Sequence, residues 1–326
     1  MYRVFLTVIV STALLFSTAG FSSRLSSDAP SIRILTLDWT SQVVLSHIAG
    51  NILQRYGYAV EYRGRPSDSQ WFMLSSGQAD VQMEVWEGSM SERFFNLLNR
   101  RLIVDAGTHS AQTREEWWFP DYVKALCPGL PDWRALNGCA GLFAQEADGR
   151  GLYFTGPWEK PDRARIRALD LNFDVVQLHD SNALRARMEA AIAARQPIMI
   201  FNWTPNWVEA MYAGEFVEFP PHSAACESDP VWGVNPELAW DCGNPTDGWL
   251  KKAVSRRLRD HHACAYQVIV RLNFDNQQIA SAAALVEIDG LDPAAAARRW
   301  LDEHSDSVDT WLGSLQCRAE QAQSDG

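Results

Sequence analysis

The chain opens, from residue 32 onward, with an alternation of strand-like and helix-like hydrophobic patterns. Residues 32–40 (IRILTLDWT) alternate apolar and polar positions, which predicts a strand. The following residues place apolar side chains at helical spacing as far as Gly57, which predicts a helix. Residues 58–65 predict a second strand, 71–78 a short helix and 79–88 a third strand. This order is typical of a parallel sheet covered by helices, so we expect an α/β fold.

A second set of elements follows in the middle of the chain. Residues 114–123 predict an extended segment that is halted at Pro120. A second βα set then contains residues 139–146, 173–180, a helix at 182–196 and a strand at 197–203. The two sets predict two α/β lobes joined within one chain.

The last part of the chain predicts helices up to Trp311. A helix start at Asp292-Pro293 precedes apolar residues at helical spacing. We expect these helices to return to the first lobe. Lobe 1 then comprises residues 31–113 and 224–318, lobe 2 comprises residues 114–223, and residues 319–326 form a tail.

The first residues have the layout of a secretory signal peptide. Arg3 supplies a basic start, Val4 to Phe16 are uncharged and mainly apolar, and Ser17-Thr18-Ala19 are the small residues typical of a cleavage site. The apolar stretch is short for a membrane span, which takes about 20 residues. We expect residues 1–30 to be a signal peptide and linker and the protein to be periplasmic; an uncut N-terminal anchor is the alternative.

Charge and cysteine content narrow the class of protein. The chain has 29 basic and 40 acidic residues, a net charge of −11, which argues against a nucleic-acid partner. Six cysteines in an exported protein favour disulfides. Spacing favours Cys127 with Cys139 and Cys226 with Cys242, each closing a loop rich in Pro, Gly and Asn. Cys264 and Cys317 either pair with each other or remain buried thiols.

Motifs for catalysis are absent from the sequence. There is no glycine-rich phosphate loop, no HExxH and no G-x-S-x-G elbow, so we expect neither an enzyme nor a cofactor. The HHAC segment at 261–264 is better explained as a solvated helix than as a metal site. The acidic loop between Cys226 and Cys242 offers hard oxygen ligands for calcium. We favour the interpretation that it is a solvated loop closed by a disulfide, and we predict no metal site.

The aromatic residues carry the candidate chemistry. The chain holds 14 Trp, and Trp39, Trp86, Trp117 (or Trp118) and Trp203 each lie at or just after the carboxyl end of a predicted strand. Ligands of open α/β sheets bind at that edge. Trp158 lies in a loop, GPWEKP. Indole faces attract cations, and several faces together can enclose a methylated ammonium group. The alternative for each Trp is packing in the core.

Four segments resemble one known family. ADVQMEVWEG, WWFPDYV, NWTPNWV and the tail from Asp292 to Leu312 resemble the OpuAC/ProX-type substrate-binding proteins of ABC transporters for glycine betaine, choline and related osmolytes. The resemblance implies a two-lobed, type II (Venus flytrap) periplasmic binding protein with an aromatic box between the lobes. It also implies a permease partner in the inner membrane and a monomer. The loop from Cys226 to Cys242 is similar to that of the trimethylamine N-oxide binders of this family.

The same resemblance assigns roles to single residues. Trp39 resembles the first residue of the aromatic box, Trp86 the one closing the E-x-W strand, and Trp203 the one opening the W-T-P-H-W pattern, in which Asn206 stands here for histidine. The predicted ligand-binding residues are Trp39, Trp86, Glu115, Trp117, Trp158 and Trp203.

The acidic residues of the predicted cleft indicate which polar group the ligand carries. The strand-end segments supply acids where a carboxylate ligand needs donors; these acids are Asp38, Glu84, Glu87, Glu115 and Glu116. This favours trimethylamine N-oxide or choline over glycine betaine. A secreted enzyme acting on methylated amines and an extracytoplasmic sensor domain are the alternative functions.

Overall fold

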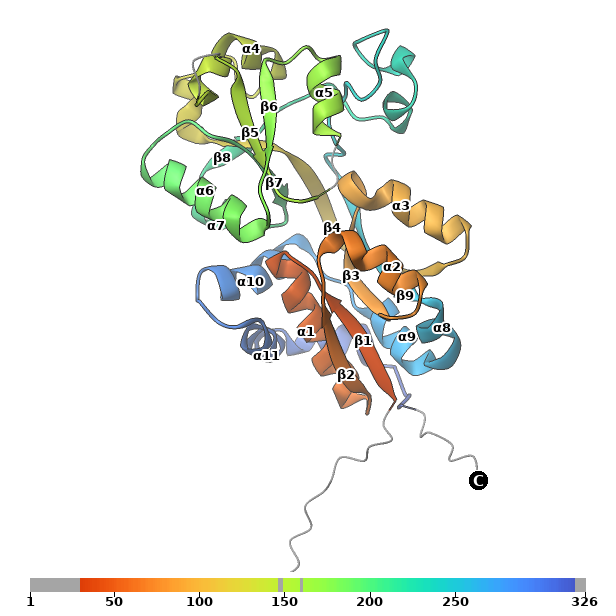
Figure 1. Ribbon diagram of the computed structural model, residues 1–326. Helices are drawn as coiled ribbons and strands as arrows, with labels where there is room; N and C mark the ends of the chain where they lie inside the picture. The colour runs from red at the N-terminus through yellow and green to blue at the C-terminus, as the bar shows by residue number, and fades with distance from the viewer. Residues whose placement is uncertain (1–29, 146–148, 159–160, 320–326) are drawn as a thin grey trace, which may run out of the picture.

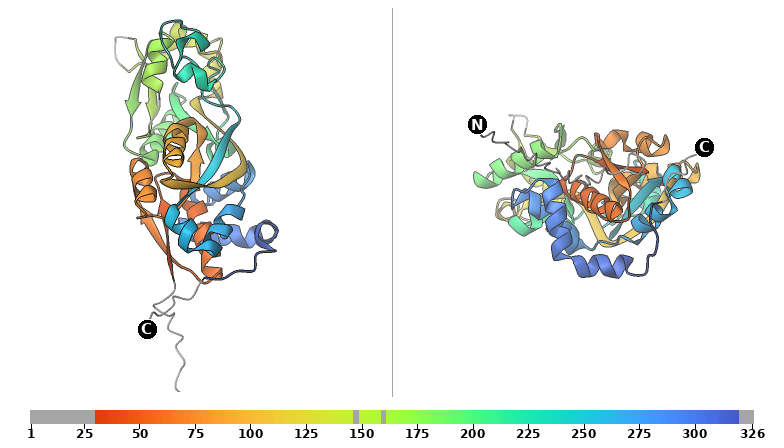
Figure 2. Two further views of the ribbon diagram at one scale, coloured as in Figure 1. Left: turned by 90° about the vertical axis from the view of Figure 1, so that its right-hand side faces the viewer. Right: turned by 90° about the horizontal axis from the view of Figure 1, so that it is seen from below.

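The computed structural model describes residues 30–145, 149–158 and 161–319, which form two lobes stacked along a long axis (Figures 1 and 2). The predicted signal peptide lies outside the described residues. Within them, no helix combines the length and apolar character that crossing a membrane requires. The two-lobed α/β fold predicted from the sequence is confirmed.

Lobe 1 is built on a sheet with the strand order β2-β1-β3-β9-β4. Strand β1 is parallel to β2 and β3, whereas β9 runs antiparallel between β3 and β4. The strands are β1 (Ser31–Thr36), β2 (Ala59–Gly64), β3 (Val81–Trp86), β4 (Ile103–Pro120) and β9 (Gly248–Ser255). Its helices are α1 (Thr40–Arg55), α2 (Gln70–Ser75), α3 (Glu87–Asn99), α8 (Arg256–His261), α9 (Ala263–Arg271), α10 (Asn276–Glu287), α11 (Pro293–Glu303) and α12 (Ser305–Leu312).

Lobe 2 takes its sheet from the second half of β4. That half pairs with β7 and β8, and β5 lies parallel to both β6 and β7. The strands are β5 (Gly151–Thr155), β6 (Phe173–Gln177), β7 (Met199–Thr204) and β8 (Gly214–Phe216), and the helices are α4 (Leu136–Cys139), α5 (Asp162–Ala168), α6 (Ser181–Ala193) and α7 (Val208–Met211).

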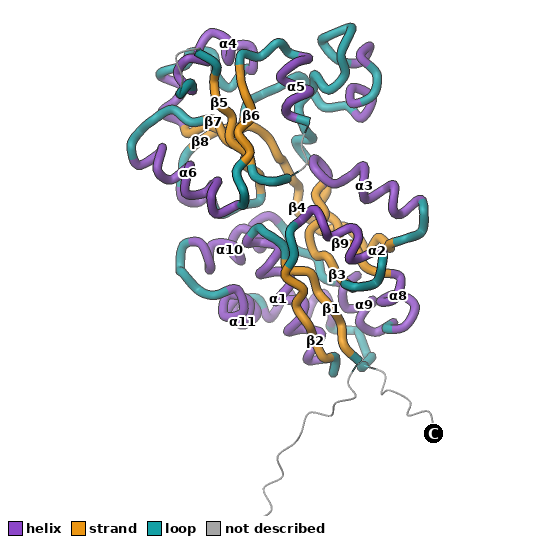
Figure 3. The backbone as a smooth tube through the Cα atoms, viewed as in Figure 1, coloured by secondary structure: helices purple, strands orange, loops and turns teal. Residues whose placement is uncertain are grey.

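Strand β4 passes from one lobe to the other, as Figure 3 shows. Its pairing with β9 ends at Thr113 opposite Gly248, and its pairing with β7 begins at Arg114 opposite Thr204. The partner strand therefore changes between two adjacent residues. This is the position at which the sequence placed the boundary between lobes.

Three parts of the sequence were assigned to the wrong kind of element or missed. Strand β9 falls where we predicted only helices; two adjacent lysines break its alternation, and one of them, Lys252, is buried. Strand β5 was not predicted. Cys139 to Phe143, placed in a βα set, instead form the end of α4 and a 3-10 turn. The segment 248–255 is a strand because it pairs with β3 and β4, which are distant in the chain. The hydrophobic pattern of the segment itself does not indicate this pairing.

Each lobe has its own hydrophobic core. Lobe 1 packs its helices around Trp300, which is fully buried, and lobe 2 packs around Trp117 and Trp118. Trp203 is partly buried and contacts both cores. Separate cores let each lobe move as a rigid body about the strands that join them.

The two disulfides favoured by the spacing, Cys127–Cys139 and Cys226–Cys242, are present, and Cys264 pairs with Cys317. The last pair settles the alternative of two free thiols, and Cys264 is therefore not available to a metal. No group of three His, Cys, Asp or Glu side chains gathers at a metal-binding distance anywhere in the described ranges.

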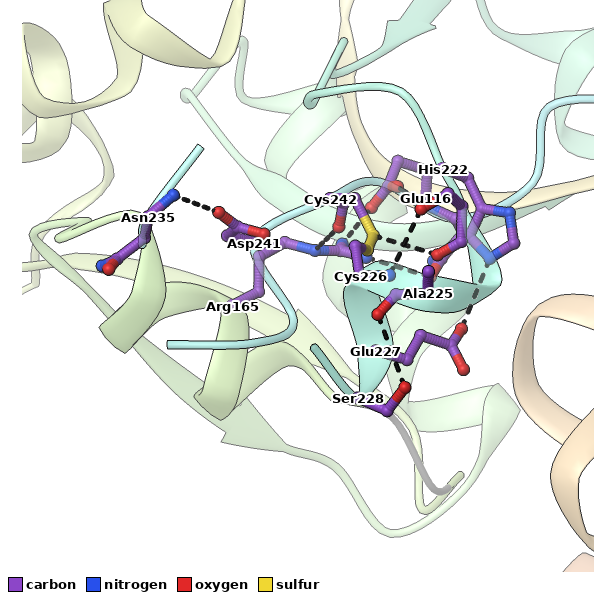
Figure 4. Close-up of a disulfide and its surroundings, with 12 residues drawn as sticks. Glu116, Arg165, His222, Ala225, Cys226, Glu227, Ser228, Asn235, Asp241 and Cys242 are labelled. Carbon is purple, nitrogen blue, oxygen red and sulfur yellow. Dashed lines mark hydrogen bonds and ion pairs between the residues drawn. A yellow bond between two sulfur atoms is a disulfide. The ribbon is translucent and has the colours of Figure 1, made fainter. Parts of the chain in front are cut away.

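The loop closed by Cys226 and Cys242 is anchored to lobe 2 (Figure 4). Arg165 of α5 donates to the Cys242 carbonyl at 2.9 Å and forms a buried ion pair with Glu116 at 2.6 Å. Asn235 donates to the Ala168 carbonyl at 2.7 Å. We therefore propose that lobe 2 extends to about residue 247, past the boundary at residue 223 predicted from the sequence.

Candidate ligand-binding site

A small apolar cavity of about 290 Å³ lies between the two lobes. Its lining from lobe 1 is Trp39, Trp86, Ser89 and Met90, and its lining from lobe 2 is Glu115, Trp158, Phe201 and Trp203. We call these eight residues the aromatic box. Five of the eight are aromatic side chains that converge on a small space, so the box suits a ligand of a few heavy atoms.

Two indoles of the box come from lobe 1 and are held from behind by one carboxylate. Trp39 precedes α1 and Trp86 ends β3. Their Nε1 atoms donate to the same oxygen of Glu84, Oε2, at 2.6 Å and 3.2 Å. Because both N–H groups are satisfied there, these indoles offer ring surface, and not a hydrogen-bond donor, to the cavity.

Glu84 is fully buried beneath these two rings. Burial raises the pKa of its carboxyl to about 7, against the opposing effect of hydrogen bonds from Trp39, Ser41 and Trp86. Its second oxygen, Oε1, has no hydrogen-bond partner among the described residues. The carboxyl group therefore changes charge close to neutral pH.

The walls from lobe 2 are aromatic rings in mutual contact. Trp158 meets Trp203 edge to face, with ring centroids 5.5 Å apart and planes at 76°. Phe201 lies 5.6 Å from Trp203 and 5.4 Å from Trp158. Phe201 and Trp203 are two residues apart on β7 and so share a face of the sheet. The three rings form a continuous apolar wall facing lobe 1.

Glu115 supplies a carboxylate to this otherwise apolar lining. It lies on β4 directly opposite Trp203 of β7 and is 5% exposed. A Cβ atom added at Gly88 would lie 2.8 Å from its Oε2 atom, so the carboxylate rests against the first turn of α3. The positive end of that helix favours a negative charge at this position. The box therefore presents aromatic faces and an acid, a combination suited to a cation.

The prediction that Trp117 contacts the ligand is not supported by its position. Trp117 is fully buried in lobe 2, stacks on Tyr153 with centroids 4.1 Å apart, and donates to Asp162 at 2.9 Å. It is two residues beyond Glu115 on β4, about 7 Å farther from the cleft at the usual rise of a strand. We therefore correct its assignment from ligand contact to core residue.

Sequence reasoning missed three residues of the box: Ser89, Met90 and Phe201. Two of them follow from simple periodicity. Phe201 is two residues from Trp203 on a strand, and Met90 is four residues from Trp86, one helical turn into α3. The five other predicted residues, Trp39, Trp86, Glu115, Trp158 and Trp203, are brought together as expected.

A second cavity of about 510 Å³ adjoins the box and shares Trp39, Phe201 and Trp203 with it. Asn206 lines this second cavity, donating to Asn202 at 3.0 Å and accepting from the Trp207 amide at 2.7 Å. Asn206 does not line the box itself. The residue that differs from the family pattern therefore lies beside the aromatic site.

Direct contacts across the cleft show that the lobes are closed. Arg185 of lobe 2 forms an ion pair with Glu287 of lobe 1, which also accepts from Thr40. The Ser181 hydroxyl donates to the Asp38 carbonyl at 2.5 Å. Burial raises the pKa of the Asp38 carboxyl, opposed by hydrogen bonds that include one from the Ser67 hydroxyl at 3.4 Å. The box is thus enclosed by contacts that an open form lacks.

Two α/β lobes closed on an aromatic cavity define a solute-binding protein. The chain belongs to the family described as the substrate binding domain of ABC-type glycine betaine transport systems, which matches residues 30–303. Members of this family bind small ligands and work with ABC permeases.

Individual relatives agree with this assignment. The chain is 35% identical over 308 residues to the trimethylamine N-oxide-binding protein of Pelagibacter ubique (strain HTCC1062), covering 90% of this chain and 93% of the relative. Among solved structures, a choline binding protein of an ABC transporter in complex with choline superposes with a TM-score of 0.70 at 18% identity, covering 89% of this chain and 93% of that one. Lactococcal OpuAC, closed with glycine betaine, gives a TM-score of 0.66 at 18% identity, covering 86% and 99%. At this identity the two structures show the shared fold.

Proposed function

We propose that the protein binds trimethylamine N-oxide, or a similarly small methylated ammonium compound such as choline, in the aromatic box and delivers it to an ABC permease. The observation that carries this proposal is Glu115 inside a ring of indoles, opposite Trp203. The rings surround the methyl groups, and the carboxylate complements the positive nitrogen. The named function of the Pelagibacter relative supports the same ligand.

The chemistry of the three candidate ligands differs at their polar end. The oxygen of trimethylamine N-oxide is a strong acceptor, and if the ligand binds together with one proton taken up from solvent, that proton forms a charge-assisted hydrogen bond between the oxygen and Glu115. The hydroxyl group of choline can donate to the Glu115 carboxylate. Glycine betaine brings a second carboxylate toward Glu115, which is unfavourable at close range. The box therefore favours the first two ligands.

The magnitude of the interaction is consistent with uptake of a dilute solute. A desolvated indole face contributes about 1–2 kcal/mol to binding a cation. Trp39, Trp86, Trp158 and Trp203 then supply roughly 4–8 kcal/mol, close to the ~8 kcal/mol of a micromolar complex.

Calorimetric titration of the mature protein with trimethylamine N-oxide, choline, glycine betaine and carnitine, under one set of conditions, tests the proposal. We expect trimethylamine N-oxide or choline to bind most tightly. Glycine betaine binding tenfold tighter than both, a difference of about 1.4 kcal/mol, is the result that overturns it. Ligand recovered unchanged after long incubation separates binding from the enzymatic alternative, which requires conversion.

The export prediction has its own test. We propose that the signal peptide is cleaved after Ala19 and that the mature protein is a periplasmic monomer. Intact-mass spectrometry of protein recovered from the periplasm should give a chain that starts at about residue 20. A retained Met1 supports the membrane-anchored alternative.

A further inference from the structure

Glu84 joins two separate segments of lobe 1 through a single atom. Its Oε2 atom accepts from Trp39 and Trp86, and from the Ser41 hydroxyl at 3.0 Å. Trp39 and Ser41 lie at the start of α1, whereas Glu84 and Trp86 lie two residues apart on β3. Glu84 does not line the box, so no contact with a ligand accounts for a carboxylate at this buried position.

We propose that Glu84 is a positioning residue that fixes the two lobe 1 indoles and is also the buried counter-charge that makes the box selective for cations. The proposal rests on the proposed function, because it concerns the same box. It assigns charge selectivity to a residue behind the rings, in addition to the acid that lines the cavity.

The positioning role follows from the hydrogen-bond geometry. An indole at a strand end can rotate about two side-chain bonds, and a hydrogen bond at its N–H atom fixes both rotations. Since Trp39 and Trp86 donate to one oxygen, their rings are also fixed relative to each other. A binding site held in its bound geometry avoids the entropic cost of ordering it when the ligand arrives.

The charge role follows from burial. A carboxylate removed from water is weakly screened, so its charge acts on the neighbouring cavity more strongly than a surface acid does. Hydrogen bonds from the indoles to the carboxylate also polarise the rings and increase the negative character of their faces. A cation between the rings benefits from both effects, whereas a neutral molecule of the same shape benefits from neither.

No basic side chain in the described part of the chain forms an ion pair with the Glu84 carboxylate. The backbone N–H of Glu84 donates to the side-chain oxygen of Gln82. That oxygen also accepts from Gln42, and the Gln82 side-chain NH₂ donates to Gln70. The ionisable groups on the neighbouring elements include Asp38 before α1, Glu87 on α3, Glu115 and His109 on β4, and Lys251 and Lys252 on β9. His109 contacts the Met83 carbonyl, Lys251 is held by Asp105, and Lys252 donates to carbonyls at the end of α9. Burial and three hydrogen bonds therefore set the protonation of Glu84.

A titrating carboxyl at this position predicts linkage between proton and cation. A bound cation favours the charged form of Glu84, so cation binding at a pH below about 7 must release a proton. Affinity for a permanent cation should therefore rise with pH up to about 7 and then level off. A neutral ligand of the same shape should show no such dependence.

The test uses tetramethylammonium and choline as permanent cations and 3,3-dimethylbutan-1-ol as a neutral analogue of choline. Calorimetry of the mature wild-type protein at pH 6 to 8.5, in two buffers of different ionisation enthalpy, should show proton release with the cations. Gln keeps an oxygen that can accept from both indoles and loses only the charge. We therefore expect Glu84→Gln to bind the cations about tenfold more weakly at pH 8, with no proton release, and to bind the neutral analogue with wild-type affinity. Asp80→Asn is the matched control, since Asp80 is a buried carboxylate paired with Arg33 and Arg257 away from the box. It should keep the wild-type pH profile.

A second readout needs neither a ligand nor a variant. In ¹⁵N spectra of the ligand-free protein, the indole N–H signals of Trp39 and Trp86 should shift together with a midpoint near pH 7, and other indole signals should not. Cation binding that is independent of pH, together with indole signals that do not titrate, overturns the proposal. A protein that binds no methylated ammonium compound, but whose two indoles titrate together, contradicts the proposed function and retains the positioning role of Glu84.

Discussion

Arg185 and Glu287 form an ion pair that joins the two lobes on one side of the cleft. Arg185 lies on α6 of lobe 2, and Glu287 is the last residue of α10 in lobe 1. The Glu287 side chain is only 9% exposed and also accepts from Thr40, so its position is fixed within lobe 1. Because the two partners belong to different rigid bodies, the pair exists only while the lobes are closed.

This pair should set the balance between the open and closed forms. Replacing Arg185 with Gln should lower ligand affinity roughly two- to fivefold, the range expected for a partly exposed ion pair. Small-angle scattering should show a larger radius of gyration for the variant in the absence of ligand. Arg299→Gln, which removes a surface ion pair within lobe 1, should change neither quantity. An unchanged affinity in Arg185→Gln would mean that closure depends on the ligand alone.

Trp203 should be the most sensitive wall of the box. Trp203→Ala should weaken binding of trimethylamine N-oxide and choline by about 1–2 kcal/mol or more, because water enters the opened cavity. Trp203→Phe should lose less, since a weaker aromatic face remains. The affinities can be compared by calorimetry.

Trp300 provides the contrasting variant, since it is fully buried in the core of lobe 1. Trp300→Ala should cost about 3–5 kcal/mol of stability while the folded protein keeps its affinity. Trp203→Ala binding as tightly as the wild type is incompatible with the aromatic box.

Glu115 should determine the choice between ligands with and without a carboxylate. Glu115→Gln removes the repulsion of a second carboxylate and adds an N–H donor, so the affinity for glycine betaine should rise relative to choline. We expect the ratio of the two affinities to change about tenfold, or about 1.4 kcal/mol. Glu61→Gln, an exposed acid on β2, serves as the control for net charge. An unaltered ratio means that Glu115 does not face the polar end of the ligand.

The buried carboxyl of Glu84 should make stability depend on pH in an unusual direction. Its pKa is about 7 in the folded protein against an ordinary value of 4.5, so the folded chain holds this proton over a range in which the unfolded chain has lost it. The contribution of Glu84 to stability therefore falls as pH rises from about 4.5 to about 7. The difference at high pH is about 3 kcal/mol.

Urea unfolding of ligand-free protein at pH 5 and pH 8.5 measures this effect. Glu84→Gln cannot ionise, so it should gain stability relative to the wild type on going from pH 5 to pH 8.5. A difference between the two proteins that is the same at both pH values would show that Glu84 stays in one protonation state.

The sequence by itself determined the class of fold and most of the box. Trp39, Trp86 and Trp203 lie at or close to the carboxyl ends of strands, the edge of a sheet at which ligands bind, because alternation and chain direction fix where a strand end lies. The cysteine spacing likewise anticipated the Cys127–Cys139 and Cys226–Cys242 disulfides. These features depend on residues that are close together in the chain.

Only the tertiary structure decided which strand-end residues face each other. Glu115 and Trp117 have the same local signature, yet the pairing of β4 with β7 leaves Glu115 at the cleft and places Trp117 against Tyr153 in the core. The shared oxygen of Glu84 and the strand character of β9 were also invisible, since both depend on segments brought together from distant parts of the chain. A local sequence pattern indicates whether a segment is a helix or a strand. Which side chains are buried, and which strands pair with one another, is decided by packing between segments distant in the chain.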